Sequence, residues 1–106
     1  MNNQNTTEAG NVSELKPLLG ARTVLSEAQR KTIQTKVEEW TITEATCRAV
    51  EECNELADAL LKFRRGRISM QRLKGEIADM RIVLEHMEYR YGNYQEELDK
   101  KVQKCA

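Results

Sequence analysis

The sequence predicts a small all-α domain, a four-helix-type bundle that works as a dimer or tetramer. Hydrophobic residues make up 40% and charged residues 32% of the 106 residues, with five glycines and one proline. This composition favours helices over a β-rich or disordered chain. Four segments place apolar residues at helical spacing between capping signals, and we see no strand pattern. A compact monomer of this size leaves much of its surface exposed, so we expect further copies to cover part of it.

The first 22 residues differ in character from the rest. Residues 1–22 contain the only proline and show little periodicity, which predicts a flexible N-terminal tail. Four apolar residues in this tail can dock on the bundle: Val12, Leu15, Leu18 and Leu19. Residues 23–106 form the helical domain. Its first helix is expected at 27–40, because the sequence from Ser26 to Gln29 has the form of a capping box.

The second helix is expected at about 44–64, with Thr43 as its N-cap. Its apolar residues gather on one side at about 100° per residue, and we expect this side to face the core. These residues are Ala49, Val50, Cys53, Leu56, Ala57, Leu60 and Leu61.

The third helix is expected at about 70–91, capped by Ser69 and ended by Gly92. Its apolar stripe consists of Leu73, Ile77, Met80, Val83, Leu84, Met87 and Tyr91. Asn93 can cap a short fourth helix at about 94–104 that is highly charged. The few apolar residues that hold this helix are Tyr94, Leu98 and Val102.

Charge and cysteine usage argue against several classes of protein. Lys plus Arg and Asp plus Glu both number 17, so the net positive field of a nucleic-acid binder is absent. The three cysteines form no CxxC pair and accompany one histidine, which gives no readable zinc site or disulfide framework. No apolar run approaches the roughly 20 residues that cross a bilayer. We therefore expect a cytoplasmic protein that binds neither nucleic acid nor membrane.

Two acidic pairs are the main candidates for chemistry. Glu52 and Glu55 lie three residues apart on the second helix, and Glu76 and Asp79 lie three apart on the third. Residues at this spacing project from neighbouring points of one helix surface. Because the turn between the helices is short, the helices should be antiparallel neighbours. Facing pairs would then place four carboxylates around one cavity.

Such a cavity calls for a hard metal ion. Clustered carboxylates repel one another unless a cation lies among them, and an all-oxygen site suits Mg²⁺ or Mn²⁺ rather than zinc. Glu76 is the most informative residue, because it falls inside the apolar stripe of the third helix. An unpaired carboxylate buried there costs free energy, and such violations of folding logic occur at functional sites. The alternative is that these acidic pairs simply face water, above all Glu52 and Glu55, which point away from Leu56 and Leu60.

The segments that carry these acids have a family resemblance. The string Glu51–Gly66, EECNELADALLKFRRG, followed by Glu76–Met87, EIADMRIVLEHM, resembles the MazG-like nucleotide pyrophosphohydrolases. The signature of that family is EExxE, a variable spacer and then ExxD. The resemblance covers about residues 27–104 and points to the small single-domain members of bacteria and their phages. It implies that Glu52, Glu55, Glu76 and Asp79 are the metal ligands and the catalytic residues.

The resemblance also implies a reaction. Family members hydrolyse nucleoside triphosphates, with Mg²⁺, between the α- and β-phosphates to a monophosphate and pyrophosphate. Lys62, seven residues after Glu55, and Arg67 in the following turn can contact phosphate, although a solvated basic helix end is the alternative. Glu51 matches the signature as well. His86, seven residues after Asp79, can reach the site or serve a structural role.

Trp40 and Tyr89 can stack on a base, although Trp40 also fits as a core anchor. The alternative function is a non-catalytic helical interaction or regulatory module that retains the family fold. No P-loop or nucleophile elbow is present, so Walker-type ATPase and serine-hydrolase activities are set aside.

Overall fold

The computed structural model describes residues 20–106 of the chain. This range contains four helices and no strand, which confirms the predicted all-α class. The helices are α2 (Glu27–Glu39), α3 (Ile42–Arg64), α4 (Met70–Tyr91) and α5 (Gln95–Cys105). Apart from residues 20–22, the expected tail, with its apolar cluster at 12–19, lies outside the described residues.

Three of the expected helix boundaries are confirmed by their capping groups. The Ser26 hydroxyl accepts from the Gln29 amide at 3.1 Å, and the Gln29 side chain accepts from the Ser26 amide at 2.8 Å, so α2 begins with a capping box. The Ser69 hydroxyl accepts from the Arg72 amide at 3.0 Å at the start of α4. Gly92 ends α4 with φ at 95°, a conformation that favours glycine.

Two expected N-caps differ from the structure, whereas the end of α3 at Arg64 is as expected. Helix α3 begins at Ile42 rather than near residue 44, because Thr41 and not Thr43 is the N-cap. Thr41 and Glu44 form a second capping box. The Glu44 carboxylate accepts from the Thr41 amide at 2.9 Å, and the Thr41 hydroxyl accepts from the Glu44 amide at 3.1 Å. Tyr94 and not Asn93 takes the N-cap position of α5, although the Asn93 Oδ1 accepts from the Gln95 amide at 3.3 Å.

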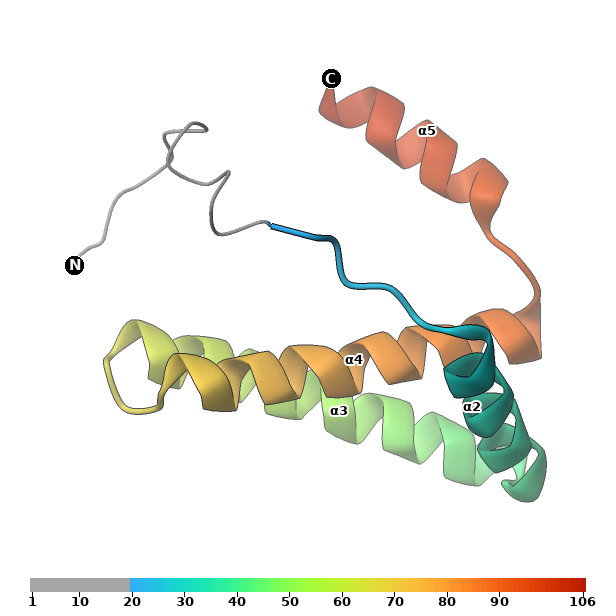
Figure 1. Ribbon diagram of the computed structural model, residues 1–106, viewed down its shortest axis with the longest axis horizontal. Helices are drawn as coiled ribbons and strands as arrows, with labels where there is room; N and C mark the ends of the chain where they lie inside the picture. The colour runs from blue at the N-terminus through green and yellow to red at the C-terminus, as the bar shows by residue number, and fades with distance from the viewer. Residues whose placement is uncertain (1–19) are drawn as a thin grey trace.

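The two long helices form an antiparallel hairpin, and α2 packs against the end of α4 (Figure 1). The turn of the hairpin contains Gly66 at φ 72°, whose amide donates to the Phe63 carbonyl at 2.9 Å. Ile33 and Val37 are buried on α2. The guanidinium of Arg30 also bonds the Glu85 carboxylate at 3.0 Å, which ties α2 to α4.

The expected core face of α3 is correct only in part, because Ala49 and Leu56 are half-buried but the other five expected residues are exposed. Its buried residue is Ala59, at 3% exposure, on the side that also carries Arg48 and Glu52. Since Ala59 is small, it lets α4 approach α3 closely. The expected core residues Val50, Leu60 and Leu61 are 50–57% exposed instead. The shielded side of α3 therefore carries Glu52 and Ala59 together with half-buried Leu56, and the side with Val50, Leu60 and Leu61 is left open.

The stripe of α4 is buried only in part. Leu73 and Val83 lie in the core, whereas Ile77, Leu84 and Tyr91 are 48, 41 and 67% exposed. Helix α5 leads away from the end of α4 (Figure 1) and has no packing on the other described helices comparable to that within the hairpin. None of the helices in residues 20–106 is long and apolar enough to span a membrane.

Candidate metal centre

The hairpin brings the two acidic pairs together. Glu52 and Glu55 on α3 meet Glu76 and Asp79 on α4, and one carboxylate oxygen of each lies within 4.8 Å of those of the others. The spacing of three residues puts each pair on one helix edge, and the antiparallel packing turns the two edges toward each other. The four residues expected at the site are therefore the four that cluster.

Burial within this cluster is uneven. Glu52 and Glu76 are half-buried, whereas Glu55 and Asp79 are exposed. The Oε1 atoms of Glu52 and Glu76 are fully shielded and have no hydrogen-bond partner among the described residues. Leaving a buried acceptor without a partner costs about 1–3 kcal/mol, and more when it is charged. A cation among the four carboxylates would remove this cost.

The electrostatics of the cluster follow from this arrangement. Burial, followed by repulsion from Glu55, Asp79 and Glu76, raises the pKa of the Glu52 carboxyl above its ordinary value of 4.5. The nearest basic group to half-buried Glu52 and Glu76 is Arg72, whose Nε lies 3.5 Å from Glu76 Oε2. This contact is long and its arginine is 61% exposed, so it offsets only part of the repulsion.

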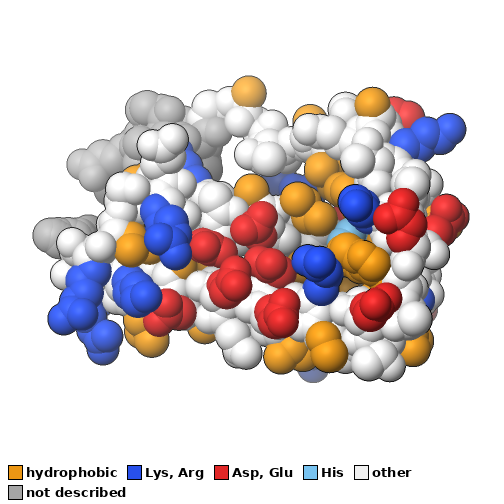
Figure 2. Space-filling model, turned by 90° about the horizontal axis from the view of Figure 1, so that it is seen from below, with side chains coloured by type: hydrophobic (Ala, Val, Ile, Leu, Met, Phe, Trp, Pro, Cys, Tyr) orange, Lys and Arg blue, Asp and Glu red, His pale blue; other side chains and the backbone are white. Residues whose placement is uncertain are grey.

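The donor set fits a hard divalent cation. Four carboxylates supply oxygen ligands without nitrogen or sulfur, and Mg²⁺ and Mn²⁺ prefer such ligands. Exposed Glu55 and Asp79 leave one side of the cluster open to solvent. The residues present can thus hold an ion and still admit a phosphate group. Figure 2 shows acidic side chains gathered in the middle of one face, with Lys and Arg on either side.

A recess of about 180 Å³ adjoins the carboxylates. It is lined by Trp40, Arg48, Glu52, Asp79, Ile82, Val83 and His86. The guanidinium carbon of Arg48 lies 4.7 Å from the centroid of the Trp40 ring, a cation–π contact. The recess therefore combines an aromatic surface, a cation and two of the clustered carboxylates.

His86 forms the inner wall of this recess. Its ring meets Trp40 edge to face, with centroids 4.9 Å apart. Burial, and then the charges of Arg90 and Arg48, lower the pKa of His86 below 6.5, against a smaller opposing effect of Glu85. The histidine expected near the site thus lines the same recess as Glu52 and Asp79, and its surroundings favour the neutral imidazole.

The remaining expected residues lie outside the cluster. Glu51 and Arg67 are exposed. The Lys62 amine lies 2.9 Å from Asp58 in a surface ion pair and lines neither the cluster nor the recess. The Tyr89 hydroxyl donates to Glu38 and is likewise absent from the recess.

Sequence reasoning did not assign Arg48 to the site. The sequence feature that could have identified Arg48 is its position four residues before Glu52, which puts both side chains on the same helix face. Trp40 was considered for base stacking, and its position at the C-cap of α2 brings it to the recess.

Comparison with known proteins adds no relative. A scan of protein-family models, a search of curated proteins and a search of solved structures each found no match to this chain.

Proposed function

We propose that the chain is a metal-dependent nucleoside triphosphate pyrophosphohydrolase that cleaves (d)NTPs between the α- and β-phosphates. The observation that carries this proposal is the four-carboxylate cluster on consecutive helices, with one orphaned oxygen each on Glu52 and Glu76. Its residues are those of the EExxE and ExxD segments that resemble the MazG-like enzymes. The products are a (d)NMP and pyrophosphate.

Glu52, Glu55, Glu76 and Asp79 would hold Mg²⁺, with Mn²⁺ as a substitute. When bound, such an ion neutralises phosphate oxygens and lowers the pKa of water for in-line attack. The carboxylates themselves fix the ion between the helices. Without it, they would repel the negative phosphates, so nucleotide binding should require the metal.

The recess beside the cluster suits the rest of the nucleotide. The Trp40 ring offers a stacking surface for a base, and Arg48 offers a positive charge to phosphate or to the base face. Neutral His86 can donate or accept one hydrogen bond. Lys62 and Arg67 are weaker candidates for phosphate contact than Arg48. Lys62 must first break its ion pair with Asp58. Glu51, exposed next to Glu52, is assigned to outer contacts of the substrate.

The test is a product-resolved assay. The purified chain is incubated with each common NTP and dNTP in Mg²⁺ or Mn²⁺, and monophosphate and pyrophosphate are quantified separately. We expect both products in equal amounts for at least one nucleotide, and none with a chelator. Glu52→Gln should lower kcat by about 100-fold or more, since it removes a ligand of the ion. Glu39→Gln, an exposed carboxylate on α2, is the matched control.

A second candidate function is a non-catalytic interaction module. The exposed apolar side of α3 and α4 favours it, because contiguous patches of this kind mark contact surfaces. This candidate gains support if no nucleotide yields pyrophosphate with either metal. That result would overturn the hydrolase proposal.

We further propose that the chain self-associates as a dimer or tetramer in the cytoplasm. The same exposed apolar surface supports self-association. Cys47, Cys53 and Cys105 are exposed free thiols, which suits a reducing compartment. Light scattering of the full chain tests the assembly, and a strictly monomeric mass contradicts it.

A further inference from the structure

Helix α5 is amphipathic but lacks a packing partner in its own described chain. Leu98 and Val102, with Tyr94 just before the helix, repeat every four residues and form one stripe, which we call the α5 stripe. These three side chains are 41–59% exposed. Residues 20–106 provide no helix that packs on α5 as α4 packs on α3. Since an isolated helix of this length is marginal in water, α5 needs a surface to rest on.

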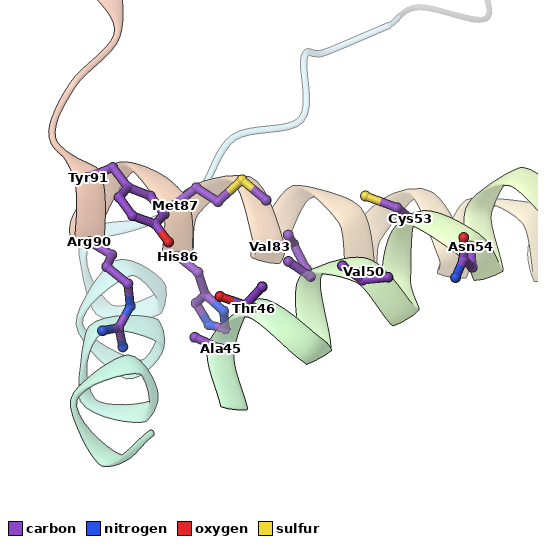
Figure 3. Close-up of a pocket in the computed structure, with 11 residues that line it drawn as sticks. Ala45, Thr46, Val50, Cys53, Asn54, Val83, His86, Met87, Arg90 and Tyr91 are labelled. Carbon is purple, nitrogen blue, oxygen red and sulfur yellow. The ribbon is translucent and has the colours of Figure 1, made fainter. Parts of the chain in front are cut away.

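A matching surface lies on the open side of the hairpin. A groove of about 290 Å³ runs between α3 and α4, with Val50 and Cys53 on one wall and Met87 and Tyr91 on the other (Figure 3). Its lining is mainly apolar, and we call it the hairpin groove.

The apolar surface continues beyond this groove along both helices. Leu60 follows Val50 and Cys53 at helical spacing on α3. Ile77 and Leu84 precede Tyr91 at intervals of seven on α4, and all three are at least 41% exposed. The groove is therefore part of a long apolar face.

We propose that the α5 stripe of one copy docks in the hairpin groove of a second copy, so that two chains exchange their C-terminal helices. The exchange is isologous, because each copy offers the same stripe and the same groove. It specifies how the self-association proposed above is built, and it rests on that association but not on the hydrolase activity.

The link between α4 and α5 argues for a second copy rather than the same chain. Gly92 has φ 95° and ψ 167°, an extended conformation of positive φ that only glycine adopts readily. It carries the chain away from the groove, whose last residue, Tyr91, directly precedes it. Figure 1 shows α5 standing clear of its own hairpin. The glycine thus directs the stripe outward.

The exposed area is also of the right size. Eight large side chains on the stripe and the apolar face are each 41–67% exposed: Val50, Leu60, Ile77, Leu84, Tyr91, Tyr94, Leu98 and Val102. Together they present on the order of 800 Å², which is what each partner contributes to an interface of standard size. Exchange of α5 would cover both surfaces at once.

The experiment is photo-cross-linking in the full-length chain. Leu98 is replaced by p-benzoylphenylalanine, copies with ¹⁴N and ¹⁵N are mixed and reassembled, and the cross-linked peptides are identified by mass. We expect cross-links that join α5 of one isotope to groove peptides, residues 45–54 or 83–91, of the other. Groove cross-links within one isotope only would place α5 on its own chain and overturn the proposal. Cross-links confined to residues 1–19 or to other surfaces would overturn it as well.

Two matched variants give an independent readout. Leu98→Asp places a charge in the stripe and should raise the dissociation constant of the assembly by at least about tenfold in sedimentation velocity. Gln103→Asp, off the stripe on the same helix, should leave it unchanged. If Leu98→Asp associates normally, the exchange fails although self-association stands. If the unmodified chain is a monomer, both fail, and a pyrophosphate-release assay still tests the hydrolase separately.

Discussion

Glu52 and Glu76 approach each other across the contact of α3 and α4, and each has one carboxylate oxygen that is buried without a partner. Each residue alone would be a poorly placed acid in a helix interface. Together with Glu55 and Asp79 they form a half-buried negative pocket, in which one carboxylate oxygen of each residue lies within 4.8 Å of the others. Repulsion within this pocket destabilises the folded chain, and a cation that binds the folded state would reverse this destabilisation. Stability and metal affinity should therefore change in opposite directions when these acids are altered.

The variant Glu76→Leu tests this opposition. The Glu76 side chain is 13% exposed and shares a helix face with buried Leu73 and Val83, and leucine removes its unpaired oxygen and its repulsion. We expect the metal-free variant to be as stable as the wild type or up to about 2 kcal/mol more stable. Mg²⁺ should raise the melting temperature of the wild type but not of the variant, and hydrolysis should be lost. Differential scanning fluorimetry and pyrophosphate release measure the two effects.

The control for this prediction is Glu39→Leu, at a site 58% exposed and paired only loosely with Lys36. It should change stability by less than about 0.5 kcal/mol and leave the Mg²⁺ response intact. If Glu76→Leu behaves like this control, the four carboxylates do not hold an ion.

The pKa of Glu52 predicts how stability depends on pH without metal. Burial and three neighbouring carboxylates raise this pKa above 4.5, so near neutral pH the ionised group opposes folding. Between the unfolded and folded pKa values the folded state binds more protons, and stability therefore falls as pH rises through this window. In a chelator, the wild type should gain stability relative to Glu52→Gln as pH decreases toward 4.5, and denaturant titrations of both chains measure this difference, from which the opposite effect of His86 cancels.

Glu52→Gln should remove the contribution of this carboxyl, because glutamine does not titrate. Saturating Mg²⁺ should also remove it in the wild type, since the cation favours the ionised carboxyl. Metal-free profiles of wild type and variant that run parallel across this window would exclude the proposed role of Glu52.

Arg48 provides a test of the recess. Its guanidinium rests on Trp40 beside Glu52, where a bound nucleotide would meet both. Arg48→Ala should raise KM for the preferred nucleotide about tenfold, while the melting shift caused by Mg²⁺ alone stays unchanged. Lys36→Ala removes an exposed cation of α2 and serves as the control. An unchanged KM would place substrate elsewhere than in the recess.

The caps and the members of the acidic cluster were predictable because their signals are local. Ser26, Ser69 and Gly92 act within one turn of their own helix, and the spacing of Glu52 from Glu55 fixes their common face. The expected start of α3 is two residues late although Thr41 and Glu44 carry the capping-box pattern, because Thr43 is also of a residue type that caps helices well.

The orientation of α3 was not predictable from its own hydrophobicity. Its most apolar side, with Val50 and Leu60, is exposed, while Ala59 and half-buried Glu52 face α4. The choice of face depends on how closely α4 can approach and on what else covers the apolar side. A helical pattern states which side must be buried but not which molecule buries it.

The last prediction uses the edge contact between His86 and Trp40, whose ring centroids are 4.9 Å apart. Burial and the charges of Arg90 and Arg48 lower the pKa of His86 below 6.5, so the folded state disfavours its protonation. Here the unfolded chain binds more protons, and the contribution of this residue to stability is present above pH 6.5 and is lost as pH falls through the lowered pKa. The pH dependence of its contribution to stability is opposite to that of Glu52.

Since Trp40 is the only tryptophan of the chain, its fluorescence reports on its contact with His86, and an imidazolium quenches indole more strongly than neutral imidazole does. We expect a fluorescence decrease with a midpoint below pH 6.5 that vanishes in His86→Phe, which keeps an aromatic edge against Trp40. A midpoint at or above 6.5 would show that His86 is not shielded by the recess, and an identical decrease in His86→Phe would assign the change to another group.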